Sequence, residues 1–366
     1  MKKHNVIDLF SGVGGLSYGF YHNDKFKVLA ANEVLPDMAK AYSLNHPDVL
    51  MYNKDIKDFS AIEFHKDTSN QYKSIDVVIG GPPCQSFSTV GNRLLDDPRG
   101  KLFQEYYRLL KEFNPKFFLF ENVTGLLSMK GGLFDYIIKL FESLSYKVDA
   151  KVLNTADYGV PQIRKRVIII GTKSDISFSY PEPTHSNINS NPDLFNLPSF
   201  RTLSEAISDL PLIKSGEESF EYRTSPQNDF QKMMRENNDI LHDHNSSIHG
   251  QHLIHLMDCL SDGGTTKDLP DNLKPKSGYG NTYAKLWWNK PSTTITRNLG
   301  TPSSSRCIHP KVSRALTTRE GARIQTFPDN FKFFGSRSSK NLQIGNAVPP
   351  MLSQILAKSI YKSFNI

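Results

Sequence analysis

Residues 6–15 read VIDLFSGVGG, a short apolar run that ends in a cluster of glycines. The run predicts a buried β-strand, and Gly12, Gly14 and Gly15 predict a tight turn directly after it. In open α/β sheets, ligands bind at the carboxyl ends of the strands, where glycines let the backbone approach closely. The stretch therefore predicts an α/β fold with a nucleotide-like ligand beside its first strand, although a purely structural turn would explain the glycines nearly as well.

Strands alternate with helices through the first half of the chain. This alternation is typical of βα units and predicts a mainly parallel sheet with helices on both faces. A carboxyl-terminal amphipathic helix is also expected, because its apolar residues recur on one face. The expected elements are further strands near 28–31, 75–79, 117–120, 147–153 and 167–171, and helices near 36–44, 104–113, 134–144 and 351–364.

The alternation stops near Tyr180, and proline, asparagine, serine and acidic residues dominate from there to about Ser225. This change in composition is typical of a passage between domains, and we place the boundary near Pro183. A second part of the chain therefore begins there, with little regular periodicity of its own.

Charge is distributed unevenly along this second part. Residues 181–258 hold 5 Lys or Arg and 12 Asp or Glu, whereas residues 267–340 hold 14 and 4. The basic segment includes Tyr283, Trp287 and Trp288, and cations interleaved with aromatic rings are typical of a surface that binds nucleic acid. A solvated basic face would explain the composition about as well.

Composition narrows the class of protein. The chain has 366 residues, of which 38% are hydrophobic and 22% charged, a balance typical of globular proteins. Its apolar runs are too short to cross a membrane, and its amino terminus does not resemble a signal peptide. Cys84, Cys259 and Cys307 are too widely spaced to indicate a disulfide framework or a zinc site. We therefore expect a cytoplasmic protein that needs no metal.

The stretch GGPPCQSFS, residues 80–88, places a cysteine just beyond a predicted strand. A glycine pair and a proline pair hold Cys84 in a loop, at the edge of the sheet where the ligand is expected. Buried cysteines usually behave as small hydrophobic residues, but a loop cysteine beside a cofactor site is a candidate nucleophile.

Charged side chains stand at the ends of other predicted strands. Glu33 and Asp55 follow strands, and carboxylates there suit the hydroxyls of an adenosine-containing cofactor. Glu121 leaves an apolar strand, so it either forms local hydrogen bonds or is held protonated for acid chemistry. Arg164 and Arg166 point to one side just before the last strand, which predicts either a surface cationic pair or a site for an anion or carbonyl.

Five motifs, in this order, resemble the signature of the DNA cytosine-5 methyltransferases: DLFSGVGG, GGPPCQSFS, ENV at 121–123, QIRKRVIIIG at 162–171 and QIGNAVPP at 343–350. The resemblance covers roughly residues 5–172 and 291–366. It implies the Rossmann-like fold of S-adenosylmethionine-dependent methyltransferases, with a smaller target-recognition domain. Two positions differ from many relatives: Ser11 replaces an alanine, and Val34 replaces an aromatic residue.

The resemblance also implies a reaction. Cys84 would add to carbon 6 of a cytosine flipped out of a specific double-stranded DNA sequence, making carbon 5 reactive toward the methyl group. Glu121 would lie at ring N3, Arg166 at the oxygen on carbon 2, and Arg164 would support the loop. The loop from Ser88 to residue 101 resembles the mobile loop of the family and is expected to contact DNA.

The same resemblance implies a pocket for S-adenosylmethionine, which would leave as S-adenosylhomocysteine. Its expected residues come from both ends of the chain. Asn346 could instead be a helix cap. The pocket would have Phe10 against adenine, Gly12 and Gly14 near the methionine, Glu33 at the ribose, Asp55 at the adenine amino group, and Pro83 and Asn346 completing it.

We expect a catalytic and cofactor-binding domain of residues 1–183 and 326–366, and a target-recognition domain of residues 184–325. Residues 184–290 lack family motifs and are expected to choose the DNA sequence, with phosphate contacts from the basic segment. The expected partner is double-stranded DNA, bound by a bacterial monomer with a cognate restriction endonuclease acting separately. The expected DNA-binding residues are Ser88, Lys276, Lys285 and Arg297, with Lys274 as a further phosphate contact. The candidate base readers are Arg223, Lys276, Tyr279, Asn281 and Arg297.

Two alternatives remain open at this stage. The tRNA-methylating branch of the same fold shares the PPC and ENV motifs, although a recognition segment of this length favours DNA. A nucleic-acid-binding relative without catalysis is the other alternative, and the presence of Cys84, Glu121 and Arg166 together argues against it.

Overall fold

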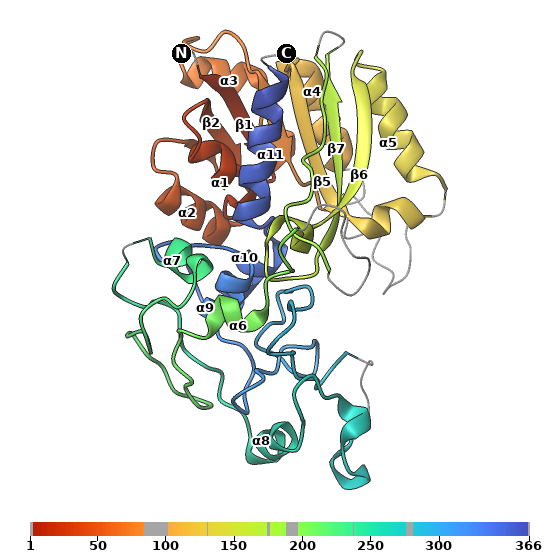
Figure 1. The fold of residues 1–366 in the computed structure, drawn as a ribbon. Coiled ribbons are helices and arrows are strands. Elements are labelled where there is room, and N and C mark those ends of the chain that lie inside the picture. The colour runs from red at the N-terminus through yellow and green to blue at the C-terminus, as the bar shows by residue number, and fades with distance from the viewer. Residues whose placement is uncertain are drawn as a thin grey trace. The chain divides into compact units, whose positions relative to one another are not determined.

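The computed structural model describes residues 3–83, 102–129, 131–173, 176–187, 197–236, 238–275 and 281–364. The chain divides into two compact units, each assembled from segments that are distant in sequence. The first unit comprises residues 1–154, 165–182 and 352–366, and the second comprises residues 155–164 and 183–351. The first unit carries the sheet, whereas short helices joined by irregular segments make up the described part of the second (Figure 1).

The first unit is built on a seven-stranded sheet in the order β3-β2-β1-β4-β5-β7-β6. The strands from β3 to β5 are parallel, and β7 is antiparallel to both β5 and β6. The central strands are almost wholly apolar, as expected of parallel strands that are covered on both faces. The strands span His4–Leu9 (β1), Phe26–Asn32 (β2), Leu50–Tyr52 (β3), Val77–Gly80 (β4), Phe117–Val123 (β5), Lys147–Asn154 (β6) and Lys165–Thr172 (β7).

One face of the sheet forms the main hydrophobic core with α3 (Ala61–Asp67), α4 (Leu102–Phe113) and α5 (Leu133–Glu142). The α4 sequence forms an amphipathic helix whose apolar stripe lies on the sheet. The hydroxyl of the buried Tyr106 donates to the carbonyls of Val78 at 3.2 Å and Leu119 at 2.9 Å, and so fixes α4 to β4 and β5.

The other face is covered by α11 (Pro350–Ser363), whose residues from 352 onward belong to the first unit (Figure 1). Phe26 of β2 packs edge-on against Tyr361, with ring centroids 6.3 Å apart. Ser353 accepts a hydrogen bond from the amide of Gly19 at 3.0 Å and donates to the carbonyl of Leu16. The end of the chain is thereby joined to α1 (Gly15–Tyr21), which is followed after β2 by α2 (Pro36–Asn45).

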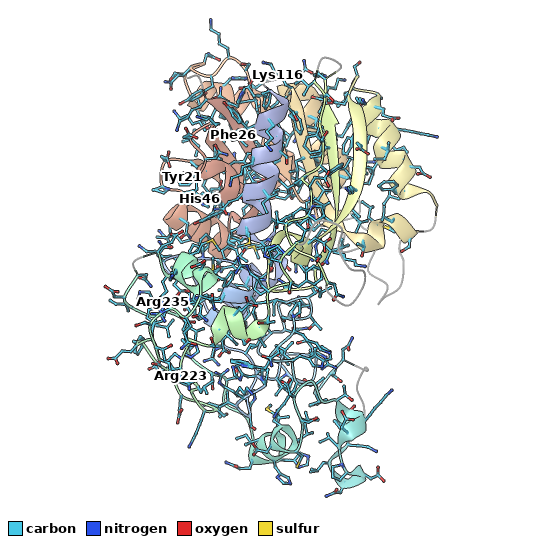
Figure 2. All side chains as sticks on the ribbon, viewed as in Figure 1. Tyr21, Phe26, His46, Lys116, Arg223 and Arg235 are labelled. Carbon is cyan, nitrogen blue, oxygen red and sulfur yellow. The ribbon has the colours of Figure 1, made fainter. Side chains whose placement is uncertain are left out.

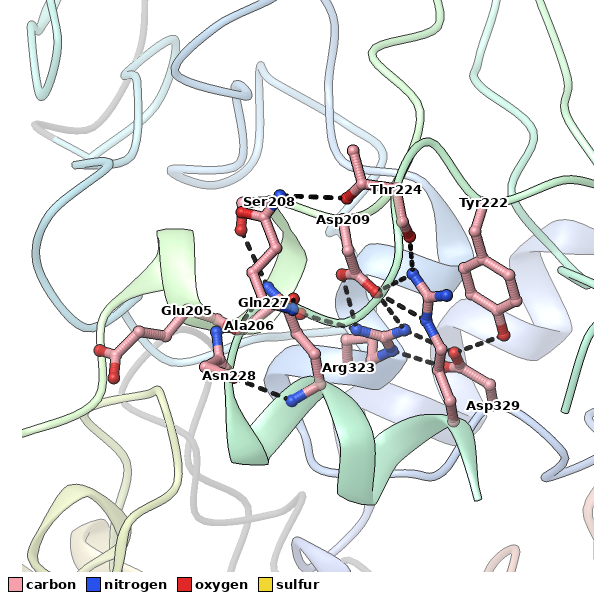
Figure 3. Close-up of polar contacts among 12 residues, drawn as sticks. Glu205, Ala206, Ser208, Asp209, Tyr222, Thr224, Gln227, Asn228, Arg323 and Asp329 are labelled. Carbon is pink, nitrogen blue, oxygen red and sulfur yellow. Dashed lines mark hydrogen bonds and ion pairs between the residues drawn. The ribbon is translucent and has the colours of Figure 1, made fainter. Parts of the chain in front are cut away.

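The second unit contains buried charges. Arg323 is fully buried, and its guanidinium contacts Asp329 at 2.6 Å and Asp209 at 3.1 Å (Figure 3). Arg235 also contacts Asp209 at 2.6 Å, and the Tyr222 hydroxyl donates to Asp329 at 2.8 Å. This network connects α7 (Asp229–Arg235) and α9 (Thr318–Ile324) with the residues just after α6 (Leu203–Ile207). The helices of the second unit are α6 (Leu203–Ile207), α7 (Asp229–Arg235), α8 (Gln251–Asp258), α9 (Thr318–Ile324) and α10 (Arg337–Asn346).

The structure confirms the predicted fold class. All the strands and long helices expected from the sequence are present, with ends that differ by a few residues. The additions in the first unit are the short helices α1 and α3, each of seven residues, and the antiparallel direction of β7. The helices α6 to α10 of the second unit were not predicted from the sequence. Short 3₁₀ helices are also present at Ile56–Asp58, Thr124–Ser128, Thr155–Tyr158, Thr266–Asp268 and Asp271–Leu273.

Candidate active site

The strand order reverses between β1 and β4, which lie side by side at the centre of the sheet. A crevice at the carboxyl ends of such strands is where open α/β sheets bind ligands. The glycine-rich loop follows β1, and the segment that leads to Cys84 follows β4. Sheet topology therefore brings the glycine-rich loop and residues 81–83, which begin the segment leading to Cys84, to one edge.

The loop after β1 has an unusual backbone. Phe10 has φ 57°, and Gly12 and Gly14 have φ 56° and 90°. A positive φ is strained for a side chain such as phenylalanine, and strain of this kind is concentrated at functional sites. A Cβ at position 14 would lie 2.4 Å from Cε1 of His46, so only glycine fits there.

Glu33 directly follows β2 and is 7% exposed. Its Oε2 accepts a hydrogen bond from the amide of Gly12 at 2.9 Å, and its Oε1 accepts one from the amide of Leu35 at 2.8 Å. Burial raises the pKa of this carboxyl above its usual value. Each oxygen keeps a further lone pair, so the carboxylate can still accept bonds from two hydroxyls.

The other expected cofactor residues lie at several strand ends. Asp55 follows β3, is exposed, and accepts a hydrogen bond from the amide of Lys57 at 3.0 Å. Pro83 is exposed beyond β4. Asn346 is exposed and is the last residue of α10, in the second unit. Val34, where relatives carry an aromatic ring, is 56% exposed beside Glu33.

A carboxylate and a guanidinium meet at the β5–β7 pair. Arg166 Nε lies 3.0 Å from Glu121 Oε1, and both side chains are largely buried. In the antiparallel register, Glu121 faces Ile168 and Arg166 faces Val123, so the two charged residues are diagonal neighbours within reach of each other.

Glu121 also borders the segment that precedes Cys84. A Cβ at Gly81 would lie 3.0 Å from Glu121 Oε2, and the side-chain amide of Asn122 donates to the carbonyl of Pro82 at 3.1 Å. The ENV segment of β5 therefore fixes the backbone just before Cys84. This arrangement brings together residues from three of the motifs found in the sequence.

Arg164 occupies a different setting from Arg166. It belongs to the second unit and is 1% exposed. Its guanidinium donates to the carbonyls of Ile295 at 3.0 Å, Gly345 at 3.1 Å and Ala347 at 3.0 Å. Its contacts are those of a residue that positions loops, because its donors are directed to backbone carbonyls.

The expected DNA-binding residues differ in accessibility. Ser88, Lys276 and Tyr279, like the expected nucleophile Cys84, lie outside the described residues. Arg297 and Lys274 are exposed, as a phosphate contact requires. Lys285 is only 7% exposed, and burial lowers the pKa of its ammonium group. Its side chain offers little surface for a phosphate, so we do not include it among the proposed contacts.

A buried polar cluster beneath the glycine-rich loop was not anticipated. The Ser17 hydroxyl donates to Asp8 and lies 2.8 Å from the hydroxyl of Tyr42. Burial raises the pKa of Asp8 to about 8 and lowers that of His46 to about 4. Tyr21 packs edge-on against His46, with ring centroids 4.7 Å apart (Figure 2). The sequence signal that could have revealed this cluster is the carboxyl group of Asp8 within an apolar strand.

Two further observations concern the described part of the chain. No group of three or more His, Cys, Asp or Glu side chains there is arranged to hold a metal ion. None of its helices combines the length and apolar character needed to cross a membrane.

Comparisons with known proteins agree with this geometry. The Type II methyltransferase M1.HphI of Haemophilus parahaemolyticus is 36% identical over 360 residues, which cover 97% of this chain and 86% of the relative. The Type II methyltransferase M.DdeI of Desulfomicrobium norvegicum is 38% identical over 380 residues, with 97% and 88% covered. The solved structure of a candidate DNA modification methyltransferase encoded within an E. coli prophage matches with a TM-score of 0.81 at 29% identity, covering 100% of both chains.

The family model of the C-5 cytosine-specific DNA methylases matches residues 4–362. Because this match spans nearly the whole chain and contains every motif of the candidate site, the protein belongs to that family and is a DNA (cytosine-5)-methyltransferase.

Proposed function

We propose that this enzyme methylates one cytosine in a specific double-stranded DNA sequence, as the modification enzyme of a Type II restriction-modification system. The names of the similar Type II methyltransferases support the assignment to such a system, and the family supports DNA as the substrate. The contact between Glu121 and Arg166, beside the backbone that leads to Cys84, is the observation that carries the proposed chemistry.

The residues at the carboxyl edge of the sheet suit S-adenosylmethionine. Glu33 offers a buried carboxylate with free acceptor positions for the ribose, and the positive-φ loop from Phe10 to Gly14 allows close approach. Phe10 would stack on the adenine and Asp55 would bind its amino group, while Pro83 and Asn346 would complete the pocket. The bound S-adenosylmethionine supplies a methyl group on a sulfonium, which leaves as the neutral thioether of S-adenosylhomocysteine.

Cys84 is the proposed nucleophile. Its thiolate adds to carbon 6 of the flipped cytosine, which breaks the 5,6 double bond and moves electron density toward carbon 5 and N3. Glu121 holds a proton at N3, and Arg166 donates to the oxygen on carbon 2. Once carbon 5 carries the methyl group, a base removes its remaining hydrogen. The electron pair re-forms the double bond, and Cys84 leaves.

The ion pair between Glu121 and Arg166 positions both side chains before the cytosine binds. With Arg166 at 3.0 Å, Glu121 has a charged partner that keeps its carboxylate in place. When a cytosine enters this site, Glu121 and Arg166 give up their contact with each other, and each contacts the polar edge of the base instead. Arg164 acts as a positioning residue through the carbonyls of Ile295, Gly345 and Ala347.

We further propose that residues 1–183 and 326–366 carry catalysis and cofactor binding, and that residues 184–325 recognise the target. Exposed Arg297 and Lys274 would contact phosphates, together with Lys276 and Ser88. Residues that read bases would lie in 184–290. We propose a cytoplasmic bacterial monomer whose cognate restriction endonuclease acts separately.

Bisulfite sequencing of DNA from cells that express the protein tests this function. Protected cytosines should appear at one short sequence motif and be missing in cells that express Cys84→Ser. Transfer of tritiated methyl groups to tRNA and not to duplex DNA would overturn the proposed substrate, as would cytosine protection without any common sequence.

A further inference from the structure

The two tryptophans of this chain, Trp287 and Trp288, are adjacent in the second unit, and both are half-buried. Neither belongs to the proposed catalytic or cofactor-binding residues. Each has a lysine ammonium near its ring: Lys290 Nζ lies 5.5 Å from the centroid of the Trp287 ring, and Lys311 Nζ lies 5.5 Å from that of Trp288. Both lysines are exposed.

The indole of Trp287 is held firmly. The guanidinium carbon of Arg306 lies 4.2 Å from the ring centroid, and Arg306 Nη1 donates to the carbonyls of Gly263 at 3.0 Å and Lys285. Gly263 has φ 72°, and a Cβ there would lie 1.9 Å from Nε1 of the indole. Position 263 therefore requires a glycine, and the Trp287 ring beside it has little freedom to move.

The charge around Trp287 is mixed, but Arg306 and Lys290, the charged groups that lie over its ring, are both cations. Asp268 acts on Arg306, and Asp258 and Asp262 act on the buried Lys285. Asp258 already accepts a hydrogen bond from Ser313, and Asp262 accepts one from the amide of Trp288 at 3.0 Å. All three carboxylates already accept hydrogen bonds, Asp268 from the amide of Thr265 at 2.7 Å, whereas the Lys290 ammonium stands exposed beside the ring.

We propose that Trp287, backed by Arg306 and flanked by Lys290, contacts the sugar–phosphate backbone of duplex DNA outside the target base pair. This proposal rests on the proposed DNA-modifying function. A flat ring beside a cation offers a surface for a deoxyribose and a charge for its phosphate. Because the indole is half-buried and pinned by Gly263, it can meet a sugar but cannot slide between base pairs. The contact therefore contributes affinity without sequence preference.

The adjacent tryptophan serves as a matched internal probe. Trp288 lies against His309, with ring centroids 5.8 Å apart, and its own backbone is held by Asp262. Trp288→Phe leaves Trp287 as the sole tryptophan emitter, and Trp287→Phe leaves Trp288. Each variant can be titrated with a dye-free duplex containing the target site, while the anisotropy of a labelled copy of that duplex reports saturation.

In Trp288→Phe, saturating duplex should change the emission of Trp287 and reduce its quenching by acrylamide. Trp287→Ala should raise the Kd at least about fivefold, by a similar factor for target and non-target duplexes. Lys290→Ala should lower the slope of log K against log salt by about one. Lys232→Ala, an exposed lysine paired with Asp229 at 3.2 Å, is the matched control and should leave the slope unchanged.

The proposal is overturned if the emission and acrylamide quenching of Trp287 stay the same at saturation, or if Trp287→Ala binds duplex as tightly as the unmodified enzyme. Tritiated methyl transfer by the unmodified enzyme is measured separately. If that transfer occurs while Trp287 is silent, the DNA-modifying function stands and only this contact is wrong. If no transfer to DNA occurs, the proposed function itself fails.

Discussion

At the scale of single residues, the side chains of Glu121 and Arg166 hold each other in place. Their contact crosses two neighbouring antiparallel strands and lies against Gly81. Glu121→Gln keeps the shape of the side chain but removes the group that would hold a proton at N3. We expect kcat to fall by about 10²- to 10⁴-fold. The measurement is single-turnover transfer of tritiated methyl to a target duplex.

Two controls make this prediction specific. Glu142→Gln changes an exposed carboxylate at the end of α5 and should leave kcat unchanged. Duplex binding by Glu121→Gln should persist, because the loss concerns the chemical step. A Glu121→Gln enzyme with more than a tenth of the normal kcat would contradict the role assigned to this carboxyl.

Asp8 leads to a prediction about pH. Its pKa is about 8 in the folded protein against an ordinary value of 3.8. Between these values the folded protein keeps a proton that the unfolded chain has lost. The free energy of unfolding should therefore fall as pH rises through this window, by up to about 1.4 kcal/mol per pH unit. The stabilisation that the Asp8 proton gives the folded protein is fully present below pH 4.

Urea unfolding between pH 5 and pH 8.5 measures the effect. Asp8→Asn replaces the titrating group with a neutral one and should make the pH profile flatter by that slope. Asp58→Asn, at an exposed position, should leave the profile unchanged. Identical profiles for Asp8→Asn and the unmodified protein would show that Asp8 does not hold this proton.

Several site residues could be predicted because their motifs are local. A glycine-rich turn after an apolar strand, or an acid at a strand end, can be read from a few adjacent residues. The contacts of Arg164 could not, because it binds Ile295 and Gly345, which are 131 and 181 residues away. The burial of Lys285 could not be predicted either, since a lysine in a basic segment is usually exposed.

At the scale of elements, the buried charges around α9 provide a test of stability. Arg323→Gln would leave Asp209 and Asp329 buried with fewer partners. Breaking such a network is strongly destabilising, and we expect a loss of about 3–5 kcal/mol in the free energy of unfolding. Arg223→Gln, which changes an exposed arginine (Figure 2), should stay within about 0.5 kcal/mol of the unmodified protein. Denaturant unfolding of both variants decides the matter, and equal stabilities would contradict the structural role of Arg323.

Element prediction succeeded where periodicity was strong. The strand at 117–120 and the helix at 104–113 have clear apolar patterns and appear as β5 and α4. The helices α1 and α3 are too short to show a helical period. The second unit resisted prediction for another reason: long-range ion pairs such as Arg323–Asp209, 114 residues apart, help to stabilise it, and these have no local signature.

At the scale of the whole molecule, we propose that chemistry and sequence choice are separable. Residues 184–290 lack the family motifs, whereas the proposed catalytic residues lie outside them. Replacing 184–290 with the equivalent segment of a relative of known specificity should give an active enzyme that methylates the relative's site. Bisulfite mapping reads the outcome, and the original enzyme assayed in parallel is the control. An active chimera that keeps the original site would place recognition elsewhere.

The central claim is that Cys84 forms a covalent bond to the cytosine that receives the methyl group. The most direct test uses a target duplex with 5-fluorocytosine at the methylated position, because fluorine cannot leave as the proton does and elimination is blocked. In the presence of S-adenosylmethionine, a complex stable to denaturing electrophoresis should form, with the mass of enzyme, DNA and one methyl group. Cys84→Ser should form none. Methyl transfer to ordinary duplex without any trapped complex, or an equal complex with Cys84→Ser, would contradict the account.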